Sequence, residues 1–154
     1  MDSYEHLAEN LKIKWIKNFD FTNKKYTQVS GYIFNEQNEL LIVKNGKAYV
    51  IPGGHPEVDE TSLDTLIREI YEEAYIEIKD IKYLGAVEVV ENNETYYQLR
   101  YVARVKNLLP FEGKWETSER VFVNIKNLID YIKWANGITF KAQVDDAYLT
   151  ITNK

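Results

Sequence analysis

The sequence predicts an α/β fold with one acidic helix near the middle of the chain, strands on both sides of it and a further helix near the C-terminus. The central helix is indicated by apolar residues at intervals of three or four, namely Leu63, Leu66, Ile67, Ile70 and Ala74. Alternating apolar and polar residues before and after this helix indicate the strands. The length of 154 residues fits a single domain, residues 1–154, with a sizeable core.

Residues 1–26 are expected to form an N-terminal extension that is largely helical. Their apolar side chains lie at roughly helical spacing: Tyr4, Leu7, Ala8, Leu11, Trp15 and Phe19. Such a helix would pack on the core or on a second subunit, so we count a homodimer through this segment among the expected partners. Its mixed charges disfavour a role at a membrane surface.

Three strands are predicted between this extension and the central helix. Residues 27–34 and 39–43 are expected to form an antiparallel pair around a turn at residues 35–38. Residues 48–51 are expected to form a short strand that leads into a Pro-Gly-Gly loop at residues 52–54. Because glycine lacks a Cβ atom, this loop can bring its backbone close to a ligand.

Strands and helices are also predicted after the central helix. Residues 81–90 and 95–105 are expected to form two long strands joined by a turn at 91–94. The remaining segments are, in order, a loop at 108–117, a strand at 120–125, a helix at 127–135 and a segment at 140–149. The last segment could be a helix or a strand, and the helical spacing of its apolar residues favours a helix.

Composition narrows the class of protein. The chain is 45% hydrophobic and 28% charged, contains no cysteine and carries a formal net charge of −5. It has no apolar run long enough to span a membrane and no signal-like N-terminus, so we expect a cytoplasmic protein without a membrane partner. The negative charge argues against a stable nucleic acid complex. An anionic substrate would need a local positive site, which bound divalent cations would supply.

Three carboxylates crowd one face of the central helix. Glu69, Glu72 and Glu73 lie at i, i+3 and i+4, so they are neighbours on the helix surface. Like charges at this spacing destabilise an isolated helix, and a bound cation would relieve the repulsion. Carboxylate oxygens without nearby cysteine or clustered histidine suit Mg²⁺, with Mn²⁺ as an alternative.

The spacing of residues through this segment resembles the Nudix box, G-x5-E-x7-R-E-U-x-E-E-x-G-U, in which U is a bulky aliphatic residue. The matching residues are Gly54, Glu60, Arg68, Glu69, Ile70, Glu72, Glu73 and Ile76. The chain departs from the pattern at Tyr75, where the family has a glycine. That glycine normally supplies a left-handed helix cap, so we expect this helix to run slightly longer or to end without the cap.

The resemblance implies the α/β/α sandwich of the Nudix family, with a mixed sheet and the acidic helix as its catalytic helix. It also implies a small-molecule, nucleotide-derived substrate: a nucleoside diphosphate linked to another moiety, hydrolysed at its pyrophosphate bond. By the same resemblance, Glu69, Glu72 and Glu73 would bind Mg²⁺, together with a backbone carbonyl of Gly53 or Gly54. Arg68 would pair with a carboxylate such as Glu60 and orient it.

The sequence leaves several roles open. The general base is Glu72 or Glu73, or else a loop glutamate as in several family members, for which Glu116 and Glu119 are the candidates. The candidates for contact with the substrate are Tyr96, Arg100, Arg104 and His55. A non-catalytic module that binds and senses a nucleotide is the alternative function. Retention of every carboxylate in the box favours the enzyme.

Overall fold

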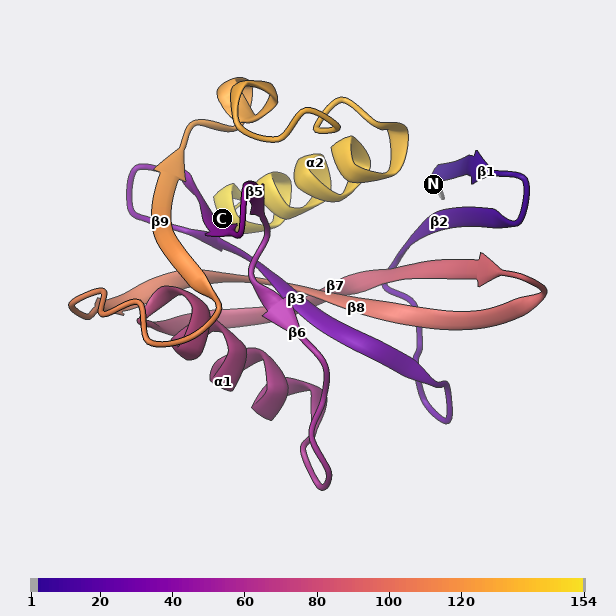
Figure 1. Cartoon of the computed structure of the whole chain (residues 1–154), viewed down its shortest axis with the longest axis horizontal. Helices are drawn as coiled ribbons and strands as arrows, with labels where there is room; N and C mark the ends of the chain where they lie inside the picture. Colours follow the sequence, from indigo (N-terminus) through magenta and orange to yellow (C-terminus); the bar gives the residue numbers. More distant parts are fainter. Residues whose placement is uncertain (1–2, 154) are drawn as a thin grey trace.

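The computed structural model describes residues 3–153, which form a mixed β-sheet with helices on both faces (Figure 1). The strands are β1 (Ser3–Ala8), β2 (Leu11–Lys17), β3 (Tyr26–Phe34), β4 (Leu40–Asn45), β5 (Ala48–Val50), β6 (Gly53–Gly54), β7 (Ile76–Glu91), β8 (Glu94–Leu108) and β9 (Thr117–Val123). Their order across the sheet is β1-β2-β7-β8-β3-β4-β5, with β6 paired to β3 and β9 paired to β4. Strands β3 and β8 are parallel, and the sheet is therefore mixed.

The two α-helices cover opposite faces of this sheet. Figure 1 shows α1 (Ser62–Ala74) below the sheet and α2 (Ile138–Thr152) above it. Alternate residues of β3 supply both cores, because successive side chains of a strand point to opposite faces. Tyr32 and Phe34 pack in the core that includes α2, whereas Val29 and Ile33 pack in the core that includes α1. The predicted α/β/α sandwich is confirmed.

The prediction of a helical N-terminal extension is wrong. Residues 3–17 form an antiparallel hairpin of β1 and β2, and β2 pairs along its whole length with β7. The decisive pattern is the alternation in Leu11–Lys17, where Leu11, Ile13 and Trp15 alternate with lysines at positions 12 and 14. Several apolar residues of residues 1–26 also lie three or four positions apart, and this spacing led to the prediction of a helix.

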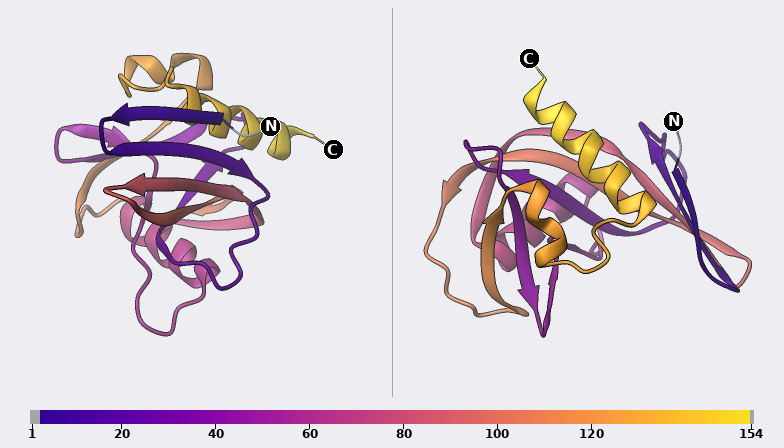
Figure 2. Two further views of the ribbon diagram at one scale, coloured as in Figure 1. Left: turned by 90° about the vertical axis from the view of Figure 1, so that its right-hand side faces the viewer. Right: turned by 90° about the horizontal axis from the view of Figure 1, so that it is seen from above.

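Helix α2 fixes this hairpin in place. Figure 2 shows the hairpin lying alongside α2, and both of its strands contact the helix. Trp15 is fully buried, and its indole N–H donates a hydrogen bond of 2.7 Å to the carboxylate of Asp146. On β1, a carboxylate oxygen of Glu5 accepts a hydrogen bond of 2.7 Å from the backbone N–H of Thr139, in the first turn of α2.

Some element boundaries differ from the sequence predictions. Strand β7 begins directly after α1 rather than at residue 81, and β9 begins inside the predicted loop at 108–117. The predicted helix at 127–135 is instead a short 3₁₀ helix, η1 (Ile125–Asp130), followed by turns closed by hydrogen bonds between residues three apart. The prediction of a helix at 140–149 is confirmed by α2. Within residues 3–153, no helix is long and apolar enough to cross a membrane.

Candidate active site

Helix α1 is fixed in rotation and position by its two ends and its apolar side. At its start, the Thr61 hydroxyl accepts a hydrogen bond from the Asp64 N–H, and the Asp64 carboxylate accepts one from the Thr61 N–H, which makes a capping box. Leu66, Ile70 and Ala74 are fully buried against the sheet. This burial leaves the acidic side of the helix beside the Pro-Gly-Gly loop.

The glycine loop lies close both to strand β3 and to the acidic side of α1. The backbone N–H of Gly53 donates a hydrogen bond of 2.7 Å to the Glu73 carboxylate. A Cβ atom on Gly54 would lie 2.4 Å from the carboxyl carbon of Glu69, and one on Gly53 would lie 2.3 Å from the Ser30 hydroxyl oxygen. A Cβ atom on Gly53 would also lie 2.4 Å from the Val29 backbone oxygen, so Gly53 is required by space, whereas at Gly54 the Glu69 carboxylate would have to move.

Arg68 binds several carboxylates of the site at once. Its Nε and Nη2 groups donate to the two carboxylate oxygens of Glu60 at 2.6 and 3.0 Å, which makes a bidentate ion pair. Its Nη1 group donates to Glu69 at 2.8 Å and to Glu72 at 3.4 Å. These contacts raise the pKa of Arg68, and the hydrogen bond from Arg68 lowers the pKa of Glu60 to about 2. Both groups therefore stay charged.

Glu73 has the opposite electrostatic environment. It is only 7% exposed, and burial raises its pKa to about 7 against the lowering effect of the Gly53 N–H. Repulsion from Glu69, Glu116 and Glu72 contributes to the same shift. Burial also raises the pKa of Glu69, although Arg68 opposes the shift. One arginine does not balance this group of carboxylates, and the site holds excess negative charge.

The residues fit a divalent cation in chemical kind and in charge. Their donors are carboxylate oxygens, which Mg²⁺ and Mn²⁺ prefer, and a cation would offset the mutual repulsion of Glu69 and Glu73. Among residues 3–153, however, no three acidic or histidine side chains are already close enough to form a ligand set. Oxygens of Glu69 and Glu73 are engaged by Arg68 and by the Gly53 N–H, so metal binding requires these side chains to rearrange.

The structure separates the two loop glutamates that the sequence left as candidates. The charge of Glu116 raises the pKa values of both Glu69 and Glu73, and Glu116 therefore lies near the acidic face. The neighbouring Thr117 is buried and donates a hydrogen bond of 2.6 Å to the backbone oxygen of Glu73. Glu119 lies on β9 and accepts a hydrogen bond of 2.9 Å from the Tyr49 hydroxyl. Only Glu116 is brought to the acidic cluster.

Tyr75 ends helix α1 in the left-handed conformation, with φ 56° and ψ 44°. The expectation that the helix would run on or lose this cap is therefore wrong. A tyrosine in this region costs about 1–2 kcal/mol relative to the right-handed conformation. The conformation of Tyr75 sets the direction in which the chain leaves the helix, because β7 begins at the next position.

Packing of the Tyr75 side chain offsets this cost. The ring is 2% exposed and contacts the rings of Tyr71, Phe111 and Trp115, with centroid distances of 6.1, 5.1 and 5.5 Å. Its hydroxyl accepts a hydrogen bond of 2.9 Å from the backbone N–H of Lys114. Since Phe111 and Trp115 belong to the loop that leads to Glu116, Tyr75 anchors that loop to the end of α1.

The four residues proposed to contact substrate lie in different places. Tyr96 and Arg100 line a cavity of about 520 Å³ between α2, the N-terminal hairpin and the sheet. Arg104 does not line that cavity, and its guanidinium donates to the backbone oxygens of Asn35 and Ile151. His55 is exposed beside the glycine loop, where its Nδ1 atom lies 2.6 Å from the Thr27 backbone oxygen.

Several residues of this cavity were not predicted from the sequence. They include three glutamines and an aromatic residue, namely Gln28, Gln98, Gln143 and Trp134. An available signal was the polar side chains at alternate positions of β3 and β8, which are unusual so near the centre of a sheet. The contributions of Trp134 and Gln143 depend on tertiary packing and leave no such signal.

A mixed sheet between two helices, with an acidic helix face beside a Gly-Gly loop, is the arrangement of the Nudix fold. The family model described as the NUDIX domain matches residues 24–142. Because this match covers more than half of the chain, the chain belongs to the Nudix family of hydrolases. The first two strands lie outside the matched range. No curated protein matches the chain in sequence.

Solved structures share this fold at low sequence identity. A mutant of the Bacillus subtilis pyrophosphohydrolase BsRppH is 16% identical with a TM-score of 0.80, and the match covers 99% of each chain. An ADP-ribose pyrophosphatase from Streptococcus suis is 17% identical with a TM-score of 0.60, covering 82% of this chain and 92% of that one. The NUDIX domain of Shewanella oneidensis NrtR, complexed with ADP ribose, is 14% identical with a TM-score of 0.65, covering 88% and 95%.

The raised pKa of Glu73 predicts how stability depends on pH. Since the pKa is about 7 in the folded protein and 4.5 for an ordinary glutamate, the folded state holds this proton more tightly than the unfolded state. In EDTA, the thermal midpoint should therefore fall as the pH rises from 5 to 8. Glu73→Gln should flatten this slope, because the glutamine does not titrate. An equally steep slope in the variant would contradict the assigned environment of Glu73.

A matched pair of substitutions separates the strain at Tyr75 from its packing. Tyr75→Ala keeps the strain and loses the buried ring, which should cost about 3–5 kcal/mol of unfolding free energy. Tyr75→Gly loses the same ring and also removes the strain, so its loss should be about 1 kcal/mol smaller. Urea unfolding measures both. An alanine variant as stable as the unsubstituted protein would show that the ring contributes nothing.

Proposed function

We propose that the chain is a divalent-metal-dependent hydrolase that cleaves a pyrophosphate bond in a nucleoside diphosphate linked to another moiety. The observation that carries the proposal is the excess of negative charge where α1 meets the glycine loop, with a pKa of about 7 for Glu73. A stable protein gains nothing from a buried carboxylate held against three others. A site that binds a cation needs the negative charge, and a site that accepts a proton near neutral pH needs the raised pKa.

Glu69, Glu72, Glu73 and the backbone carbonyl of Gly54 are the groups that would hold Mg²⁺ or Mn²⁺. When bound, the ion would neutralise phosphate charge and lower the pKa of a coordinated water. Arg68 keeps Glu60 and Glu69 in place through charged hydrogen bonds. The N–H of Gly53 orients Glu73 towards the loop.

The structure supports Glu116 or Glu73 as the proton acceptor for the attacking water. Glu73 is suited by its raised pKa, which is close to neutral. Glu116 is suited by its position, because it belongs to the acidic cluster but lies on a loop rather than on α1. Glu72 has no comparable feature beyond its contact with Arg68, and Glu119 is held by Tyr49.

The substrate class rests on the solved relatives and on the cavity. Those relatives include an Ap4A hydrolase, an ADP-ribose pyrophosphatase and a complex with ADP ribose. A small nucleotide-derived substrate for this chain is consistent with a cavity of about 520 Å³, a size typical of small-molecule sites. A cytoplasmic location, a homodimer and the absence of a stable nucleic acid complex stay predictions of the sequence.

Hydrolysis is tested with a panel of nucleotide sugars, ADP-ribose, dinucleoside polyphosphates and nucleoside triphosphates in Mg²⁺. We expect release of phosphate-containing products from at least one class, and no release in EDTA. Glu73→Gln should lower turnover by at least about 10²-fold, the usual cost of losing an acid–base group. Glu77→Gln, just past the end of α1, is the matched control and should leave turnover unchanged.

Two outcomes would contradict this proposal. Unchanged activity in Glu73→Gln would remove this residue from metal binding and proton transfer. No turnover across the panel, together with tight nucleotide binding, would instead identify the chain as a nucleotide-sensing module.

Glu116 and Glu119 provide a second matched pair. Glu116→Gln should lower kcat by about 10²-fold if Glu116 accepts the proton, because the amide cannot do so. Glu119→Gln should change kcat by less than about threefold, since this carboxylate binds the Tyr49 hydroxyl outside the acidic cluster. Steady-state kinetics in saturating Mg²⁺ measures both. Equal losses in the two variants would contradict the different positions of these side chains.

A further inference from the structure

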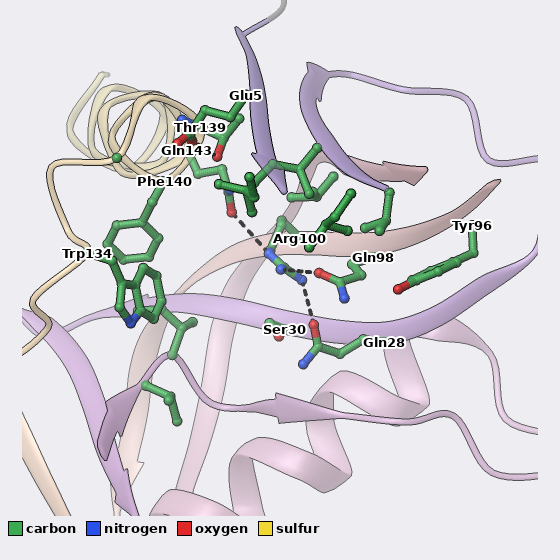
Figure 3. Close-up of a pocket in the computed structure, with 18 of the residues that line it drawn as sticks. Glu5, Gln28, Ser30, Tyr96, Gln98, Arg100, Trp134, Thr139, Phe140 and Gln143 are labelled. Carbon is green, nitrogen blue, oxygen red and sulfur yellow. Dashed lines mark hydrogen bonds between the residues drawn. The ribbon is translucent and has the colours of Figure 1, made fainter. Parts of the chain in front are cut away.

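The cavity beside α2 has a charged floor without a matching counter-charge. Figure 3 shows Arg100 at its centre, with dashed hydrogen bonds to three glutamines. No carboxylate among residues 3–153 forms an ion pair with Arg100. Burial lowers the pKa of Arg100 and raises the pKa of the neighbouring Tyr32, so Tyr32 stays neutral and supplies no negative charge.

Arg100 fixes the orientation of the three amides. A guanidinium has only donors, and each amide that binds it must therefore present its oxygen. The donors are Nε to Gln143 at 3.1 Å, Nη1 to Gln28 at 3.2 Å and Nη2 to Gln98 at 3.0 Å. Gln143 also accepts a hydrogen bond of 2.7 Å from the Tyr32 hydroxyl. Rotating an amide would bring its NH₂ group against the guanidinium.

The NH₂ groups of these glutamines are consequently left as donors. Within residues 3–153 none of the three donates a hydrogen bond, and no buried side-chain nitrogen lacks a partner. Each NH₂ group is therefore at least partly accessible, and all three glutamines line the cavity. A ligand at this floor meets these three NH₂ groups as donors without an acceptor, and oxygen or nitrogen acceptors on the ligand would satisfy them.

The walls and the rim restrict the ligand further. Trp134 and Phe140 form an edge-to-face pair at one end, and Tyr96 lies at the other (Figure 3). Apolar residues of β2 and β7 line the side between them. At the rim, the carboxylates of Glu5 and Glu91 also line the cavity, and these disfavour a dianionic phosphate. A flat heteroaromatic ring with carbonyl oxygens satisfies both the walls and the floor.

The cavity adjoins the candidate active site through the sheet. Ser30 lines the cavity and pairs with Gly53 in the β3–β6 ladder. Gly53 in turn donates its N–H to Glu73. Val50 and Ile51 also line the cavity and lead directly into the glycine loop. A ligand seated here therefore lies next to the loop that borders the acidic face.

We propose that this cavity selects a nucleobase with an exocyclic carbonyl, such as hypoxanthine or uracil, over the counterpart that carries an amino group at that position, through the donor-rich floor that Arg100 and its three glutamines form. The proposal rests on the proposed function, because it assigns the base of the hydrolysed nucleotide. An adenine or cytosine would place an amino group against NH₂ donors. Such a mismatch leaves buried donors unpaired and is heavily penalised in sites built from hydrogen bonds.

Calorimetric binding of nucleoside monophosphates in EDTA tests this selection without hydrolysis. The pairs are IMP against AMP, and UMP against CMP, since each pair exchanges one exocyclic carbonyl for an amino group and the neighbouring ring N–H for an unprotonated ring nitrogen. We expect the oxo member of each pair to bind at least about 10-fold more tightly, the effect of one lost hydrogen bond or more. Equal binding within both pairs, or tighter binding of AMP and CMP, would overturn the proposal, as would no binding of any of the four.

A substitution identifies the floor as the cause. Gln98→Glu is nearly isosteric, keeps an oxygen towards Arg100, removes one NH₂ donor and neutralises the guanidinium. It should weaken binding of IMP by about 10-fold and reduce the preference over AMP. Gln37→Glu, in the exposed turn between β3 and β4, is the matched control and should bind as the unsubstituted protein does.

The outcomes of these measurements are distinct from those of the hydrolysis panel. An unchanged preference in Gln98→Glu overturns the role of the floor. If Gln98→Glu does not fold, as judged by its thermal unfolding, Gln28→Glu tests the same floor. Loss of hydrolysis with the base preference intact would contradict the proposed function but not the cavity. Hydrolysis without base preference would contradict the role of the cavity but not the proposed function.

Discussion

The close approach of the glycine loop to helix α1 is the constraint on which the rest of this site depends. With the Gly53 N–H bound to Glu73 and Gly54 packed against the Glu69 carboxylate, the loop and the helix form one unit. This contact buries Glu73, and the burial raises its pKa. A side chain at position 53 would clash with the backbone of β3 and displace the loop from Glu73. The space between the loop and β3 thus helps to set the chemistry of a carboxylate.

The left-handed Tyr75 shows how a chain can depart from a family pattern without losing the geometry that the pattern serves. Glycine reaches this conformation without steric cost, whereas tyrosine reaches it because its ring is held among Phe111 and Trp115. Arg120 adds to the same end of the helix by donating to the backbone oxygens of Ala74 and Tyr75. The loop before β9 is thereby fixed to α1, at the cost of about 1–2 kcal/mol in backbone strain.

Sequence reasoning succeeded where the pattern is local and failed where it depends on partners distant in the chain. The acidic helix follows from residues within a single segment, and so does the pairing of Arg68 with Glu60. The N-terminal hairpin forms because Leu11–Lys17 pairs with β7 and packs against α2. Both partners are distant in the chain, so the sequence of the segment itself does not reveal them. Arg100 and Arg104 lie on the same side of one strand, yet only the fold decides that the first lines a cavity and the second binds backbone oxygens.

The two halves of the site use charge in opposite ways. At α1 the carboxylates outnumber their single arginine, so a ligand there would have to supply positive charge. At the cavity floor one arginine is surrounded by neutral amides, so a ligand there would have to supply hydrogen-bond acceptors. The ladder between Ser30 and Gly53 holds these two environments in neighbouring positions of the same sheet. A ligand with an acceptor-rich ring at one end and metal-bound phosphates at the other would satisfy both, whereas either half alone would leave one charge imbalance in place.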